Sequence, residues 1–200
     1  MNQTSHPNVS TRLFDAMELA FRLHGRDVRK STDIPVMTHL LSVCGLVLHD
    51  GGDEDEAIGA LLHDAIEDKP EQIGISDIRE QFGERVAAIV EISSDTPPGY
   101  KGGPKPPWRD RKEAYLEHVK RSDPSLLRVT VADKVDNVRA ILADYRRVGE
   151  SLWSRFNAGK EDQLWYYQAA ASAYRSAGFE TDLLLKLEEL VDELKLVVTK

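Results

Sequence analysis

The sequence has a single cysteine, Cys44, so no disulfide bond can form within the chain. Its apolar runs are short, and none approaches the roughly 18 residues that a membrane-spanning helix needs. The first residues, MNQTSHPNVS, lack the basic and apolar segments of a secretory signal peptide. These absences together predict a cytoplasmic protein with no membrane partner.

Basic residues are also fewer than acidic residues. The chain has 26 lysine and arginine residues against 34 aspartate and glutamate residues, which gives a formal net charge of −8. A protein that coats nucleic acid needs a basic face, so no nucleic-acid partner is expected. A small basic pocket for an anionic ligand is still compatible with this balance. Apolar residues make up 41% of the chain, which is enough for the core of one domain spanning residues 1–200.

Strand-like alternation is almost absent, and apolar residues recur instead at the three- and four-residue spacing of helices. We therefore predict an all-α fold, a single helical bundle with a core of about residues 11–176 and a C-terminal helix at about 180–198. That last helix could pack on the bundle or pair with a second copy in a homodimer. The other predicted helices cover residues 11–24, 36–50, 53–68, 75–94 (two short helices), 109–121 and 125–147, and one more begins near 161.

One segment interrupts the helical pattern. TPPGYKGGPKPPW, from Thr96 to Trp108, has five prolines and three glycines, which is incompatible with a helix or a central strand. We predict a surface loop inserted between helices. A lid over a binding site is the alternative.

The stretch LLHDAIEDK, Leu61 to Lys69, places four polar groups in an apolar run. On a helical wheel at about 100° per residue they share one face; these groups are His63, Asp64, Glu67 and Asp68. A solvated face of an amphipathic helix would show the same pattern. One turn earlier, however, that face carries Ala57 and Ala60, which leave room for a ligand or another helix.

Two further polar residues lie in apolar surroundings. In LLRVTVADKVDNVRAIL, Asp133 lies four residues before Asn137, on a different face from the apolar stripe, and needs a partner if it is buried. The alternative is a surface aspartate paired with Lys134. His39, within VMTHLLSV, is either a core histidine or a ligand. Two histidines and two aspartates form a set that suits a divalent metal ion.

These motifs resemble those of a known family. LLHDAIED matches HD-x-x-ED, and the order His39, His63-Asp64, Asp133 matches the H…HD…D signature of the HD metal-dependent phosphohydrolases. Together with the later ADKVDN, the sequence resembles the hydrolase domain of the RelA/SpoT proteins and their small stand-alone relatives, the metazoan SpoT homologues. The resemblance runs from about Phe14 to Tyr174, and no synthetase domain follows in the sequence.

The resemblance implies an enzyme that hydrolyses the 3′-pyrophosphate of (p)ppGpp to leave GDP or GTP. It implies one Mn²⁺ ion as cofactor, held by His39, His63, Asp64 and Asp133. Glu67 and Asp68 would orient or deprotonate the attacking water. The residues that would contact the nucleotide substrate are Arg29 and Lys30, with Arg26, Asn137 and Lys134; for Lys134 a structural salt bridge is the alternative.

The sequence departs from the family's pattern near the expected nucleotide pocket. It lacks the usual tyrosine before His39 and the usual proline after it, and it has Asp136 where tyrosine, histidine or alanine is commoner. The identity of the base therefore stays open, and adenosine alarmones such as (p)ppApp are an alternative. Two other functions are weighed: a phosphohydrolase of ordinary nucleotides, such as a 5′-nucleotidase, and a non-catalytic nucleotide sensor.

Overall fold

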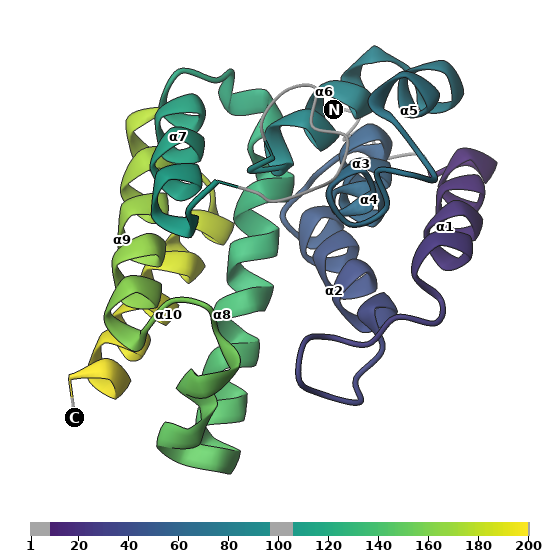
Figure 1. Ribbon diagram of the computed structural model, residues 1–200. Helices are drawn as coiled ribbons and strands as arrows, with labels where there is room; N and C mark the ends of the chain where they lie inside the picture. The colour runs from purple at the N-terminus through teal and green to yellow at the C-terminus, as the bar shows by residue number, and fades with distance from the viewer. Residues whose placement is uncertain (1–8, 97–105, 200) are drawn as a thin grey trace.

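The computed structural model describes residues 9–96 and 106–199, and the regular elements in these ranges are helices apart from one bridge between Val28 and Pro35 (Figure 1). The all-α prediction is confirmed. The α-helices are α1 Thr11–His24, α2 Val36–His49, α3 Glu54–Leu62, α4 Ala65–Asp68, α5 Ile75–Phe82, α6 Glu84–Ser93, α7 Trp108–Lys120, α8 Arg128–Val148, α9 Lys160–Ser176 and α10 Asp182–Val198. Short 3₁₀ helices at Pro124–Leu126 and Gly149–Arg155 flank α8.

Helix α8 organises the bundle. It runs through the middle of the molecule, with α2 and α3 on one side and α9 and α10 on the other (Figure 1). In this 21-residue helix Val131, Val135 and Val138 are fully buried, and so is Leu127 just before it. Because α8 contacts both halves of the bundle, a polar residue on it can meet side chains from either side.

Helix α3 is buried along most of its length rather than on one face, and the residues from Glu56 to Leu62 are all buried. Its small residues allow neighbouring helices to approach closely. At Gly59 an added Cβ would lie 2.6 Å from Cγ2 of Ile89 on α6. Ala57 and Ala60 are fully buried, so the space that they leave on this helix is filled by protein.

The prediction of one continuous helix over residues 53–68 is wrong. Helix α3 begins with a capping box between Asp53 and Glu56 and ends at Leu62, and α4 starts at Ala65. His63 Nδ1 donates to the carbonyl oxygen of Ala60 at 2.8 Å. In a continuous helix that oxygen would accept from the backbone N–H four residues later. The side chain therefore competes with the helix at this point, and the junction holds His63 and Asp64.

Two other expectations concern the proline- and glycine-rich segment and the C-terminal helix. Residues 97–105 of the predicted proline- and glycine-rich loop lie outside the described residues. Helix α10 packs against α8 and α9 of its own chain, which confirms the first of the two roles weighed for it. Among the described helices, none has the length and apolar character to cross a membrane. The single-domain organisation, with its core at about 11–176, stays a prediction.

Candidate metal centre

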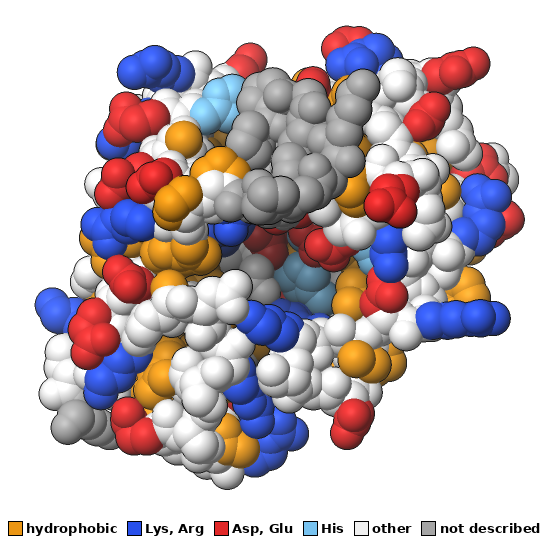
Figure 2. Space-filling model, in the orientation of Figure 1, with side chains coloured by type: hydrophobic (Ala, Val, Ile, Leu, Met, Phe, Trp, Pro, Cys, Tyr) orange, Lys and Arg blue, Asp and Glu red, His pale blue; other side chains and the backbone are white. Residues whose placement is uncertain are grey.

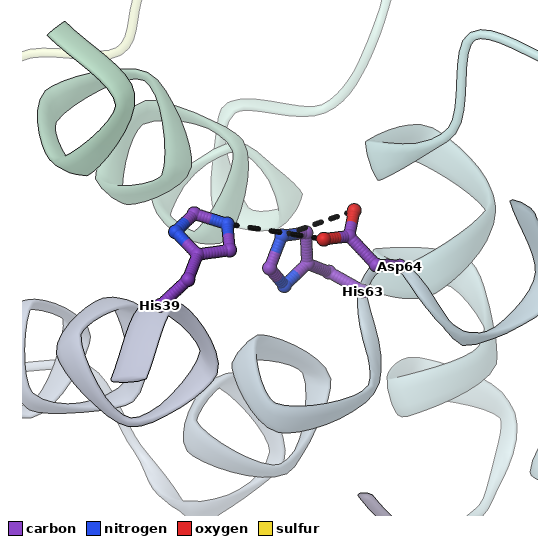
Figure 3. A group of neighbouring side chains, drawn as sticks. All are labelled: His39, His63 and Asp64. Atoms are coloured by element: carbon purple, nitrogen blue, oxygen red, sulfur yellow. Dashed lines mark ion pairs between the residues drawn. The ribbon is translucent and has the colours of Figure 1, made fainter. Parts of the chain in front are cut away.

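Three parts of the chain bring the four predicted metal ligands together. His39 comes from α2, His63 and Asp64 come from the junction between α3 and α4, and Asp133 comes from α8. Figure 3 shows the two imidazole rings and the Asp64 carboxylate directed toward one another. Both histidines and Asp133 are buried, so Asp133 is not the surface aspartate of the alternative interpretation.

The distances between the polar atoms fit one metal ion. His39 Nε2 lies 3.2 Å from Asp133 Oδ1 and 3.8 Å from Asp64 Oδ2. His63 Nε2 lies 3.3 Å from Asp64 Oδ1 and 3.7 Å from Asp133 Oδ1. An ion about 2.0–2.2 Å from nitrogen and oxygen ligands would separate neighbouring ligands by roughly 3–3.6 Å. The four side chains therefore need little movement to surround a cation.

The tautomers of both histidines favour metal binding. The Nδ1 atom of His63 donates to the Ala60 carbonyl, and that of His39 donates to Asp136 Oδ2 at 2.6 Å. In the neutral form of each ring, the Nε2 atom therefore carries a lone pair directed at the carboxylates. His63 Nε2 is buried and has no hydrogen-bond partner among the described residues. A buried nitrogen of this kind fits a divalent cation as its missing partner.

The charges in the centre are mutually dependent. Burial opposes the charge on Asp133, but the adjacent Lys134 ammonium and the two histidines hold its pKa well below the usual range. Burial also disfavours protonated His39, yet hydrogen bonds to Asp133 and Asp136 outweigh it and raise the pKa of His39 to about 9. The carboxylates thus attract positive charge into a buried site. A divalent cation supplies that charge and displaces the imidazole protons.

A cavity of about 340 Å³ borders the centre. Figure 2 shows it as a hollow with histidine visible inside and acidic and basic side chains around it. Of the predicted site residues, those that line it are Lys30, Asp64, Glu67, Asp68, Asp133, Lys134 and Asn137. Lys134 also pairs with Asp133, which is the structural salt bridge weighed for it, and its contact with the nucleotide stays a prediction. The predicted catalytic pair lies on α4, where Glu67 Oε2 accepts from the Ser94 hydroxyl at 3.3 Å.

The predicted arginines do not line the cavity. Arg29 donates to Asp136 Oδ2 at 3.0 Å and to Asn137 Oδ1 at 2.8 Å, so its guanidinium lies behind the cavity wall. Arg26, on the same loop, is exposed and lies outside the lining residues. Lys30 does reach the cavity, and its ammonium donates to Asn157 Oδ1 at 2.8 Å.

One wall of the cavity was largely missed by sequence reasoning. It comes from α7 and α9 and includes Trp108, Lys112, Tyr115, Tyr166 and Tyr167. Tyr166 and Tyr167 are buried, yet they also contribute to this wall. Lys112 pairs with the buried carboxylate of Asp95 at 2.6 Å. The basic run RDRK that contains Lys112 has the pattern of a solvated helix start, so its composition gave no signal.

Asp136 is the second residue that sequence reasoning did not place in the site. Its carboxylate contacts His39, Arg29 and the Ser42 hydroxyl. The only signal in the sequence was its departure from the family's pattern. That departure was assigned to the nucleotide pocket, whereas in the structure Asp136 contacts His39, one of the predicted metal ligands.

The helical fold and the H…HD…D arrangement define the class of protein. The family model of the HD domain matches residues 16–164, and the chain belongs to this family. Family membership implies a divalent metal ion at the centre formed by His39, His63 and Asp64. The matched span agrees with the resemblance found in the sequence.

Several relatives are named as alarmone hydrolases. The chain is 32% identical over 145 residues to guanosine-3′,5′-bis(diphosphate) 3′-pyrophosphohydrolase MESH1 of Xenopus tropicalis. This alignment covers 71% of this chain and 74% of that protein. The chain is also 31% identical over 137 residues to the guanosine-3′,5′-bis(diphosphate) 3′-pyrophosphohydrolase of Aquifex aeolicus. That alignment covers 68% of this chain but 18% of that protein. A solved metazoan SpoT ortholog superposes with a TM-score of 0.74 at 22% identity, over 93% of this chain and 97% of that one, and supports the fold.

Proposed function

We propose that this protein is a Mn²⁺-dependent hydrolase that removes the 3′-pyrophosphate from guanosine or adenosine alarmones such as (p)ppGpp. Water adds to the 3′-linked phosphorus, the bond to the ribose oxygen breaks, and pyrophosphate leaves with GDP or GTP as the other product. The observation that carries this proposal is the convergence of His39, His63, Asp64 and Asp133 at the edge of a cavity that also contains an acidic pair. The names of the relatives support the same reaction.

The residues of the site have different roles in the proposed reaction. A divalent cation, when bound, lowers the pKa of water and offsets charge that builds on the attacked phosphorus. Glu67 and Asp68 border the cavity one turn beyond Asp64, where a carboxylate can orient the water and accept its proton. Burial of both histidines keeps bulk water away from the side of the centre that faces the core.

Binding of an anionic nucleotide is supported by the cavity wall. Lys30, Lys112 and Lys134 line it, and their ammonium groups provide positive charge in a protein whose net charge is −8. The partly exposed aromatic side chain of Trp108 offers a face on which a base can stack. Asn137 presents an amide to the same space. We expect Arg29 to act on the nucleotide only if it leaves Asp136.

The two alternatives lack a comparable observation. A sensor without catalysis has no need for an acidic pair beside an intact ligand set. A nucleotidase for ordinary nucleotides has less need of a pocket with three lysines. Manganese is favoured over magnesium because two imidazoles suit Mg²⁺ poorly. The cytoplasmic location and the homodimer stay predictions.

The test of this function is pyrophosphate release from ppGpp and ppApp, with GMP as an ordinary nucleotide for comparison. We expect release from at least one alarmone with Mn²⁺, loss of release in EDTA, and recovery when Mn²⁺ is restored. Thin-layer or ion-exchange chromatography of the products would distinguish pyrophosphate from single phosphates. Phosphate release from GMP without any alarmone turnover would support the nucleotidase instead.

A further inference from the structure

One carboxylate, that of Asp136 on α8, joins three side chains, two from α2 and one from the loop before it. Its Oδ2 accepts from His39 Nδ1 of α2 at 2.6 Å and from Arg29 Nη1 of the preceding loop at 3.0 Å. Its Oδ1 accepts from the Ser42 hydroxyl at 2.5 Å. The side chain is 14% exposed, so water competes weakly for these bonds.

The bond to His39 has a direct effect on the metal centre. A carboxylate behind a ligand histidine fixes the tautomer and the orientation of the ring, and makes the opposite nitrogen a better ligand. His39 Nε2 points at Asp133 at 3.2 Å and at Asp64 at 3.8 Å. Rotation of the ring would lose the bond to Asp136 and turn Nε2 away from both carboxylates.

The bond to Arg29 makes Asp136 part of a closed ring of side-chain contacts. The other arm of the guanidinium donates to Asn137 Oδ1 at 2.8 Å. The amide of Asn137 in turn donates to Asp133 Oδ1 at 2.5 Å, and that oxygen faces His39 Nε2. Two proposed metal ligands and two proposed nucleotide-contacting residues are thus linked through Asp136.

We propose that Asp136 is a positioning residue that couples the loop carrying Arg29 to metal binding at His39. The inference rests on the proposed function, because it takes the four-ligand centre as the metal site. The coupling follows from the shared oxygen: a change in Arg29 alters the bond that orients His39. Because a coupling free energy is reciprocal, metal binding then stabilises the contact between Arg29 and Asp136 by the same free energy.

The test measures Mn²⁺ affinity from the electron paramagnetic resonance signal of free Mn²⁺, with no nucleotide present. Asp136→Asn keeps the size of the side chain and removes its charge, and we expect about 10- to 100-fold weaker binding. Ser42→Ala leaves the His39 bond in place and should give a smaller loss. The matched control is Asp144→Asn on the same helix, which removes a carboxylate that pairs with Arg147 and Arg155 and should leave the affinity unchanged.

The coupling itself is tested with Arg29→Gln. The guanidinium of Arg29 donates to Asp136 and Asn137, neither of which is a proposed metal ligand. We expect the substitution to weaken Mn²⁺ binding several-fold in the wild-type background but to add little to Asp136→Asn. Arg22→Gln, exposed on α1, is the matched control. Circular dichroism and melting in EDTA would identify variants that fail to fold. If Asp136→Asn is one of them, the Mn²⁺ affinities of Ser42→Ala and Arg29→Gln still test the coupling.

The outcomes separate this inference from the proposed function. Wild-type affinity in Asp136→Asn, or full additivity of its effect with that of Arg29→Gln, would overturn the coupling while leaving the hydrolase intact. Weakened Mn²⁺ binding with the expected non-additivity would support it even if no alarmone is hydrolysed. Failure of the wild-type protein to bind Mn²⁺ would overturn both.

Discussion

Asp64→Asn is expected to lower the rate of pyrophosphate release by about 10³-fold or more. The variant keeps the size of the side chain but removes the charge that faces both imidazoles, at 3.3 Å from His63 and 3.8 Å from His39. A catalytic metal ion supplies several kcal/mol of transition-state stabilisation. Each 1.36 kcal/mol corresponds to about a tenfold change in rate. Steady-state assays at saturating Mn²⁺ and at limiting Mn²⁺ would measure the loss.

The side chain of Asp64 is 34% exposed, and makes no capping hydrogen bond to α4, so the substitution should not unfold the protein. Asp192→Asn, exposed on α10, is the matched control and should retain full activity. Wild-type rates in Asp64→Asn at limiting Mn²⁺ would contradict the ligand assignment.

Glu67→Gln is expected to lower kcat by about 10²- to 10⁴-fold, the range that general acid–base groups contribute. The amide keeps the contact with Ser94 available but cannot accept the proton of the attacking water. Mn²⁺ affinity should stay at the wild-type value, because Glu67 is placed outside the four ligands. The pair of measurements, kcat from product release and Mn²⁺ affinity from paramagnetic resonance, separates a proton acceptor from a ligand.

Glu71→Gln provides the control for Glu67, since this exposed side chain lies just beyond α4 and outside the cavity lining. It should leave kcat and Mn²⁺ affinity unchanged. A large loss of Mn²⁺ affinity in Glu67→Gln would instead make Glu67 part of the metal centre. An unchanged kcat would move the catalytic role to Asp68 or to another group.

The helices were predictable because their apolar spacing is strong, and α1 and α8 lie close to the positions expected for them. The interruption after Leu62 was not, since LLHDAIED contains no proline or glycine to signal a break. It arises from the hydrogen bond of His63 to Ala60, which depends on how a buried ring is oriented. The polar residues were therefore assigned correctly to one region but to the wrong local geometry.

The meeting of His39 and His63 with two aspartates was predictable from a motif, whereas the side chains that hold them in place were not. Asp136 meets His39 across 97 positions of sequence and Arg29 across 107, so its role depends on tertiary packing. The same holds for Lys112, which reaches the cavity because α7 packs on α9. Residues that contact a site from distant elements leave no periodic or local pattern in the sequence. The predicted contact of Arg29 with the nucleotide stays a prediction, and its guanidinium pairs with Asp136 and Asn137 in the structure.

The most direct measurement of the central claim is the anomalous diffraction of crystals of this protein grown with Mn²⁺. The account predicts one strong anomalous peak among His39 Nε2, His63 Nε2, Asp64 and Asp133, within coordination distance of each ligand atom. The peak should vanish in Asp64→Asn crystals at the same Mn²⁺ concentration. A peak elsewhere, or none at this position in the wild-type protein, would contradict the metal centre on which the proposed hydrolysis depends.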